Sequence, residues 1–160
     1  MPARAVIVAE AAGWLGTPYR HQASLKGVGC DCLGLVRGVW RGLHGDEPEA
    51  VPGYTRDWAE AGGVEALAEA GRRHLVEIAP AAARPGDVLV FRMRPGGPAK
   101  HAGILVEAAG EPGRRSGAGG RPRAPRFVHA YEGAGVVTTR LTRWWVGRLA
   151  FAFRFPGVDD

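Results

Sequence analysis

Cysteine and serine are both scarce in this chain of 160 residues, which has two of each. Neither serine stands in a G-x-S-x-G pattern, which argues against a serine hydrolase. The chain also has no C-x-x-C or H-x₃₋₅-H spacing, which short zinc-binding loops use, and no phosphate-binding glycine loop. The two cysteines and the five histidines are left as the residues to examine for chemistry.

Long apolar runs are missing as well. The longest run near the start, residues 5–9 (AVIVA), ends at Glu10. It is too short for the apolar core of a secretory signal or for a membrane span. We therefore expect synthesis in the cytoplasm without a signal peptide, and no insertion into a membrane.

Positive charge is concentrated in one segment instead of being spread over the chain. The net charge is +5, and residues 110–126, with five arginines and one glutamate, contribute +4 of it. Domains that bind nucleic acid usually distribute basic residues over a folded face and interleave them with aromatic residues. Here glycine and proline accompany the arginines, so we expect a flexible insertion at 108–126 and no nucleic-acid partner.

The apolar periodicity predicts helices first and strands afterwards. Helical spacing predicts helices at 4–15, 32–43 and 57 to about 75. Alternation and turn residues predict strands at 88–93, 101–107, 127–132, 136–140 and 149–155, with one helical turn at 141–146. This order is typical of an α+β fold with an antiparallel sheet, and the length fits a single domain over residues 1–160.

The two cysteines, Cys30 and Cys32, are separated by one residue. A disulfide between them would close a very small ring, and a chain made in the cytoplasm tends to keep its thiols reduced. A zinc site shared with two histidines has suitable ligand types but lacks the usual spacing. Two inert, buried thiols are a third possibility.

Cys32 is the stronger candidate for a nucleophile. Asp31 is a good N-cap, which places Cys32 in the first turn of the following helix. There the unpaired N–H groups and the helix dipole stabilise a thiolate. Cys30 precedes the helix, receives no such help, and is expected to fill a small apolar niche.

The helix expected at 32–43 carries a glycine at every fourth position: Gly34, Gly38 and Gly42. Each glycine costs a helix about 1 kcal/mol relative to alanine. The stripe therefore indicates that the helix backbone packs closely against another element. Such packing would hold Cys32 rigidly at the edge of the sheet.

A protonated thiol needs a base before it can attack. His21, His44 and His74 fall in loop or exposed-helix contexts and are expected to be solvated. His101 begins one expected strand and His129 lies in another. Spacing alone does not distinguish a catalytic pair from two ordinary surface histidines.

Four blocks follow one another along the chain: GTPYRHQASLKGVGCDCLGLV, RPGDVLVFR, HAGILV and FVHAYEGAGVV. Their order resembles the NlpC-type family of papain-like cell-wall cysteine peptidases, and the likeness spans about 13–156. Members of this family typically cleave the D-glutamyl–diaminopimelate bond of peptidoglycan stem peptides. The resemblance implies a permuted papain-like fold, peptidoglycan stem peptides as substrate, and no metal or other cofactor.

The same resemblance implies roles for five residues. DCLGLV stands where the family has DCSGLV, which assigns Cys32 as the nucleophile. His101 then corresponds to the base, and His129 to the residue that orients it. Tyr19, in GTPY, matches a family tyrosine that lines the active site and helps to hold the oxyanion. Asp31 is placed with it as an oxyanion-side or substrate-binding residue.

Three further stretches, GCDCLGLVRGVW, PGYTRDW and AFAFRFP, resemble a subgroup found in phages and gene-transfer particles. In that subgroup the peptidase accompanies tail proteins. The resemblance therefore implies a component of a phage-like particle that acts in the periplasm or cell wall, with tail proteins as further partners. A structural tail adaptor on the same fold, or an acyltransferase or lipid amidase, are the alternatives.

Overall fold

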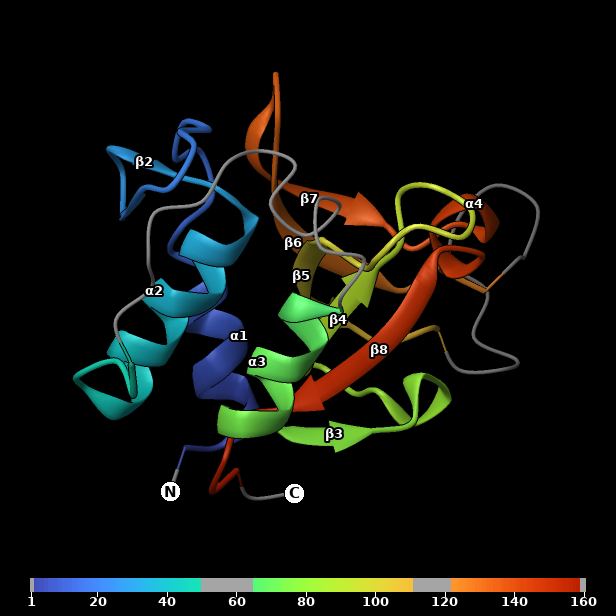
Figure 1. Ribbon diagram of the computed structural model, residues 1–160, viewed down its shortest axis with the longest axis horizontal. Helices are drawn as coiled ribbons and strands as arrows, with labels where there is room; N and C mark the ends of the chain where they lie inside the picture. Colours follow the sequence, from blue (N-terminus) through green and yellow to red (C-terminus); the bar gives the residue numbers. More distant parts are fainter. Residues whose placement is uncertain (1, 50–64, 111–121, 159–160) are drawn as a thin grey trace.

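The computed structural model describes residues 2–49, 65–110 and 122–158, and its helices and main sheet form layers (Figure 1). The elements in chain order are α1 (Arg4–Ala12), β1 (Ser24–Leu25), β2 (Gly29–Cys30), α2 (Cys32–His44), α3 (Ala66–His74), β3 (Val76–Ile78), the 3₁₀ turn η1 (Pro80–Ala82), β4 (Val88–Phe91), β5 (His101–Glu107), β6 (Arg126–Tyr131), β7 (Gly135–Arg140), α4 (Arg143–Val146) and β8 (Leu149–Arg154). Six strands pair antiparallel in the order β3-β8-β4-β5-β6-β7, and β1 pairs with β2 separately. The expected α+β class with an antiparallel sheet is confirmed.

Among the helices of the described ranges, none has the length and apolar character needed to cross a membrane.

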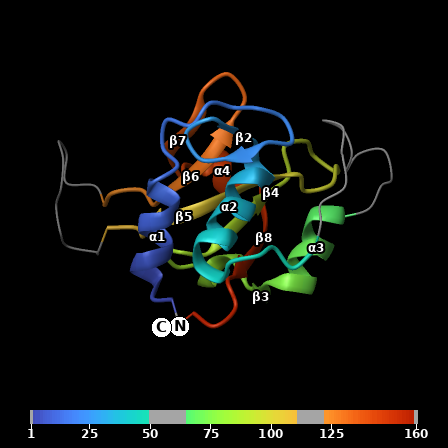
Figure 2. The same ribbon diagram turned by 90° about the vertical axis from the view of Figure 1, so that its left-hand side faces the viewer.

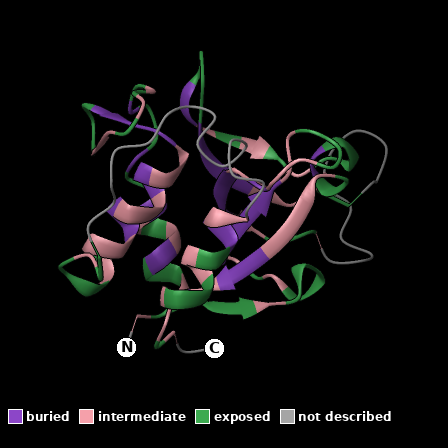
Figure 3. Cartoon of the chain, in the orientation of Figure 1, coloured by how far each residue is buried: buried purple, intermediate pink, exposed green. Residues whose placement is uncertain are grey.

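The main sheet buries both of its faces, because side chains alternate along its central strands. On β4, Val88 and Val90 join the apolar cluster that includes residues of α1 and α2. Leu89 and Phe91 point to the opposite face, where Trp145 of α4 joins a second cluster. Figure 2 shows α1 and α2 in front of the sheet, and Figure 3 shows buried residues concentrated in the central strands.

The start of α2 is fixed by a side-chain cap, as the sequence predicts. Asp31 is the N-cap, and its carboxylate accepts a hydrogen bond from the backbone N–H of Gly34. Leu35 and Val39 are fully buried and give the helix one apolar face. The helix therefore begins at Cys32, which lies in its first turn.

Two of the α2 glycines lie where another segment approaches the helix closely. A Cβ atom on Gly34 would overlap the backbone carbonyl of Ala23, and one on Gly38 would overlap the indole ring of Trp14. Trp14 is itself buried. The close packing that the glycine stripe predicts is therefore confirmed.

We expect Gly38→Ala to lower the free energy of unfolding by about 2 kcal/mol, because the overlap with a buried ring places the overpacking cost near its upper end of about 3 kcal/mol, and the gain in helix propensity returns about 1 kcal/mol. The added methyl group would press on the buried ring of Trp14. Gly42→Ala is the matched control, because the methyl group there meets the side chain of Glu10, which can move. Urea unfolding measures both variants, and a Gly38→Ala protein as stable as the wild type would contradict the expectation.

Some short elements differ from those expected. The first helix was expected to extend to residue 15, but it ends at Ala12, and residues 13–16 form a turn. The strands β1 and β2 lie between the first two expected helices, and β3 lies just before the first expected strand; no strand was expected at any of these three places. Strands of two or three residues are too short to show an alternating pattern. Residues 57–64 of the expected third helix lie outside the described residues, and its remaining part is α3.

The expected insertion at 108–126 connects β5 to β6, and its central part, 111–121, lies outside the described residues. At its ends, the N–H of Gly110 donates to the carbonyl of Arg123 at 2.9 Å. The guanidinium groups of Arg123 and Arg126 each lie 3.8 Å from the carboxylate of Glu107. The two described ends of the insertion are therefore joined to each other and to β5.

Candidate active site

Asp31 links the start of α2 to the loop that precedes it. Its Oδ1 accepts from the N–H of Gly34 at 2.7 Å, and its Oδ2 accepts from the N–H of Gln22 at 2.7 Å. The residue is 3% exposed, and Nδ1 of His21 lies 3.9 Å from Oδ2. The Asp31 carboxylate thus joins the first turn of α2 to the backbone at Gln22, and this fixes the position of Cys32 at the start of the helix.

Tyr19 is held beside the cysteines by a parallel β-bridge to Cys30. The N–H of Cys30 donates to the carbonyl of Pro18, and the N–H of Arg20 donates to the carbonyl of Cys30, both at 3.0 Å. Both thiols are free. Cys30 is fully buried in the core, as expected, whereas Cys32 is half-buried.

His101 and His129 lie on adjacent strands, β5 and β6, and the structure brings their rings together. Nε2 of His101 is 2.8 Å from Nδ1 of His129. Nε2 of His129 is in turn 2.8 Å from Oγ1 of Thr139 on β7. The result is a hydrogen-bonded chain of three side chains across three neighbouring strands.

Aromatic rings pack around the two histidines and help to bury them. The rings with centroids 4.5–6.0 Å from one or both imidazoles are those of Phe91, Phe127, Tyr131 and Trp145. Burial lowers the pKa of His101 to about 3, an effect to which His129 adds, and burial lowers the pKa of His129 to about 4. Both imidazoles are therefore neutral at pH 7.

Acid is expected to destabilise the fold through these two histidines. In the unfolded chain the two histidines are protonated near their ordinary pKa of 6.5. In the folded protein they stay neutral until the pH falls to about 4. Between these values the unfolded state binds more protons, so stability rises with pH. The urea midpoint should fall as the pH is lowered from about 6.5 to about 4. A His129→Gln variant, which lacks one of the two groups, should show a shallower fall, and an unchanged slope would refute this account.

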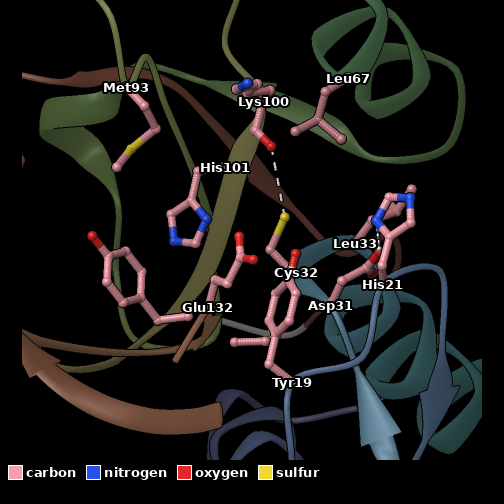
Figure 4. A pocket seen from close by; sticks show the side chains of 12 residues that line it. Tyr19, His21, Asp31, Cys32, Leu33, Leu67, Met93, Lys100, His101 and Glu132 are labelled. Atoms are coloured by element: carbon pink, nitrogen blue, oxygen red, sulfur yellow. Dashed lines mark hydrogen bonds and ion pairs between the residues drawn. The ribbon is translucent and has the colours of Figure 1, made fainter. Parts of the chain in front are cut away.

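The Cys32 thiol is protonated in the free protein. Its Sγ donates to the backbone carbonyl of Lys100, 3.6 Å away (Figure 4). Burial and, to a smaller extent, the charge of Asp31 raise the pKa of Cys32 to about 11, against backbone hydrogen bonds that lower it. The backbone N–H groups of the first turn lower the pKa of Cys32, the direction that the sequence predicts, but desolvation and the charge of Asp31 outweigh them in the free protein.

Cys32 and His101 open onto one cavity of about 510 Å³. Its lining residues include Tyr19, His21, Asp31, Cys32, Lys100, His101 and Glu132. Figure 4 shows the sulfur of Cys32 and the ring of His101 both pointing into this cavity. His129 is 1% exposed and supports His101 from within the protein.

Sequence reasoning missed several residues at the site. His21, which was expected to be solvated, is half-buried and lines the cavity together with Lys100 and Glu132. Thr139 was missed although a signal existed. Alternation along the paired strands 127–131 and 135–139 places Thr139 on the same sheet face as His129.

The fold and the cavity have the arrangement seen in papain-like cysteine hydrolases, with a thiol at a helix N-terminus and a histidine on an antiparallel sheet lining one cleft. Within the described ranges, no three His, Cys, Asp or Glu side chains gather as metal ligands would. The model of the NlpC/P60 family matches residues 16–152 of the chain. The chain therefore belongs to the NlpC/P60 family, and its fold is that family's papain-like fold.

Solved structures have the same fold. The NlpC/p60 domain of the peptidoglycan hydrolase SagA matches with 26% identity and a TM-score of 0.57, over 96% of this chain and 100% of that chain. An NlpC/P60 family protein from Bacillus cereus ATCC 10987 matches with 20% identity and a TM-score of 0.61, over 96% of this chain and 40% of that chain. This chain thus spans the whole SagA domain but about two fifths of the Bacillus protein's chain. A search among curated proteins gave no match.

Proposed function

We propose that this chain is a cysteine peptidase that hydrolyses amide bonds in peptidoglycan stem peptides. The observation that carries the proposal is the cavity shared by Cys32 and His101, with His129 hydrogen-bonded behind His101. Membership of the NlpC/P60 family supports it. The SagA domain, which this chain covers from end to end, belongs to a peptidoglycan hydrolase and supports the substrate class.

In the proposed mechanism His101 takes the thiol proton at Nδ1. Its Nε2 is bonded to His129, so Nδ1 is the nitrogen left to accept the proton of Cys32. Burial disfavours a lone charge on either residue. Transfer from one to the other creates two opposite charges that attract each other, and it leaves the net charge of the site unchanged. The thiolate then attacks the scissile carbonyl.

The oxyanion forms at the first turn of α2. Backbone N–H groups there lack helical acceptors, so the N–H of Cys32 is available to donate to the oxyanion. Tyr19 lines the same cavity and is a second donor. The protonated His101 gives its proton to the leaving amine, and water then attacks the thioester with His101 as base, which restores the thiol. Asp31 contributes by fixing the turn, and no metal or cofactor takes part.

The charges around the cavity suit a stem peptide. Lys100 lines it together with Asp31 and Glu132, so both signs are present. Stem peptides carry free carboxylates, and diaminopimelate adds an amine. This match supports the D-glutamyl–diaminopimelate bond as the target within the stem.

Incubation with purified peptidoglycan tests this function. Mass spectrometry of the released fragments should find the mass of one water added at each cut, with a new carboxyl group on the D-glutamyl residue and a new amine on diaminopimelate. Cys32→Ala protein should release none of these fragments. Fragments that carry an added acyl acceptor in place of water would show a transferase, and no new termini at all from the wild type would refute the proposal.

We also propose that the peptidase serves a phage-like particle during penetration of the cell wall. The support is the resemblance of GCDCLGLVRGVW, PGYTRDW and AFAFRFP to the tail-associated subgroup. Particles purified from the host by density centrifugation should contain the chain together with tail proteins when their peptides are identified. Finding the chain in the cells but not in the particles would refute this role.

A further inference from the structure

Thr139 provides the outer end of the hydrogen-bonded chain behind His101. It lies on β7, where its Cα is paired with that of Phe127 on β6, and its Oγ1 is 2.8 Å from Nε2 of His129. The other rings around His129, apart from His101, are those of Phe127, Tyr131 and Trp145. Within the described residues, the Thr139 hydroxyl is therefore the polar partner that satisfies the outer nitrogen of a fully buried imidazole.

The three side chains can share their protons in two directions. In the first, Nε2–H of His101 donates to Nδ1 of His129, and Nε2–H of His129 donates to Thr139. In the second, Thr139 donates to Nε2 of His129, and Nδ1–H of His129 donates to Nε2 of His101. The second direction places the proton of His101 on Nδ1, the nitrogen that has to receive the proton of Cys32.

Catalysis is compatible with the first direction alone. When His101 accepts the thiol proton, both of its nitrogens become donors, so Nδ1 of His129 has to be an acceptor. His129 then carries its proton on Nε2, deep in an aromatic surrounding, where an unpaired N–H is costly. A hydroxyl at position 139 removes that cost, because it can accept from His129 while its own hydrogen turns toward solvent at this half-exposed residue.

We propose that Thr139 is a positioning residue of the active site, whose hydroxyl accepts the Nε2 proton of His129 and thereby keeps Nδ1 of His101 free to act as the base. The catalytic consequence rests on the proposed peptidase function. The assignment of the protons does not, and it can be measured without substrate.

The experiment compares Thr139→Val, which keeps the shape but lacks the hydroxyl, with Thr139→Ser, which retains it. Thr138→Val is the matched control, because Thr138 is the neighbouring residue of β7 and is exposed. We expect Thr139→Val to lower kcat/KM on peptidoglycan fragments about 10- to 100-fold, mainly through kcat. Leaving a buried N–H donor without a partner costs a free energy that corresponds to about a 10- to 100-fold change in an equilibrium constant. Thr139→Ser should stay close to the wild type, and Thr138→Val should be unchanged.

Two readouts are independent of the substrate. In ¹⁵N NMR of histidine-labelled wild type, His129 should carry its proton on Nε2 and not on Nδ1, and Thr139→Val should shift the proton toward Nδ1. The rate of alkylation of Cys32 by iodoacetamide at neutral pH should fall in Thr139→Val and recover in Thr139→Ser. A wild-type His129 protonated on Nδ1, or a Thr139→Val protein with wild-type alkylation and kcat, would overturn the inference. If the wild type releases nothing from peptidoglycan, the proposed function fails, while the NMR and alkylation results still decide the role of Thr139.

Discussion

Cys32→Ala is expected to abolish hydrolysis, with a loss of at least about 10³-fold in kcat, because no other group at the site can form the covalent intermediate. Cys30→Ala should retain most of the activity. Its thiol is fully buried in the core and does not line the cavity that Cys32 and His101 share. Its removal leaves a small void, for which a cost of about 1 kcal/mol in the free energy of unfolding is expected.

The two thiols should also differ in reactivity. Burial raises the pKa of Cys30 to about 12 and that of Cys32 to about 11, and Cys32 alone is partly exposed. Peptide mapping after iodoacetamide treatment should therefore find the label on Cys32 first, at a rate that increases with pH through the neutral range. An inactive but folded Cys30→Ala protein, or faster labelling of Cys30, would reverse the assignment.

The elements that the sequence predicts well are those specified by neighbouring residues. Asp31 caps α2 through a hydrogen bond three residues along the chain, and β5 begins and ends where alternation places it. The strand β3 was missed because it depends on a distant partner. Its Val76 lies opposite Arg154 of β8, a pairing that no local pattern encodes.

The site divides in the same way. The motifs are sufficient to select Cys32 and His101 as the candidate nucleophile and base. They do not predict the pKa values of these two side chains, because those values depend on how deeply the folded protein buries them. The dipole of α2 is a local feature and favours a thiolate. Burial, with the charge of Asp31, is a larger effect of opposite sign on the pKa of Cys32. Trp145, which packs on both histidines from α4, is likewise visible only in the folded structure.

The histidines are expected to contribute unequally to the rate. His101→Ala should remove activity about as completely as Cys32→Ala, because the nitrogen that accepts the thiol proton is lost. His129 touches neither the cavity nor the thiol, and acts by holding His101 through the 2.8 Å contact between their rings. Loss of an orienting residue leaves more activity than loss of the base, so His129→Ala should retain about 10- to 100-fold more activity than His101→Ala.

Side-chain replacements at position 129 separate hydrogen bonding from packing. An amide oxygen can accept from Nε2–H of His101, so His129→Asn and His129→Gln should both be more active than His129→Ala. His44→Ala is the control, because His44 is exposed, packs against Trp40 with its ring tilted, and does not line the cavity. Measurement of kcat at saturating substrate, with urea unfolding of each variant to confirm the fold, decides the order. If every His129 variant is as inactive as Cys32→Ala while His101→Ala keeps measurable activity, the two histidines have exchanged roles, and His129 is the base.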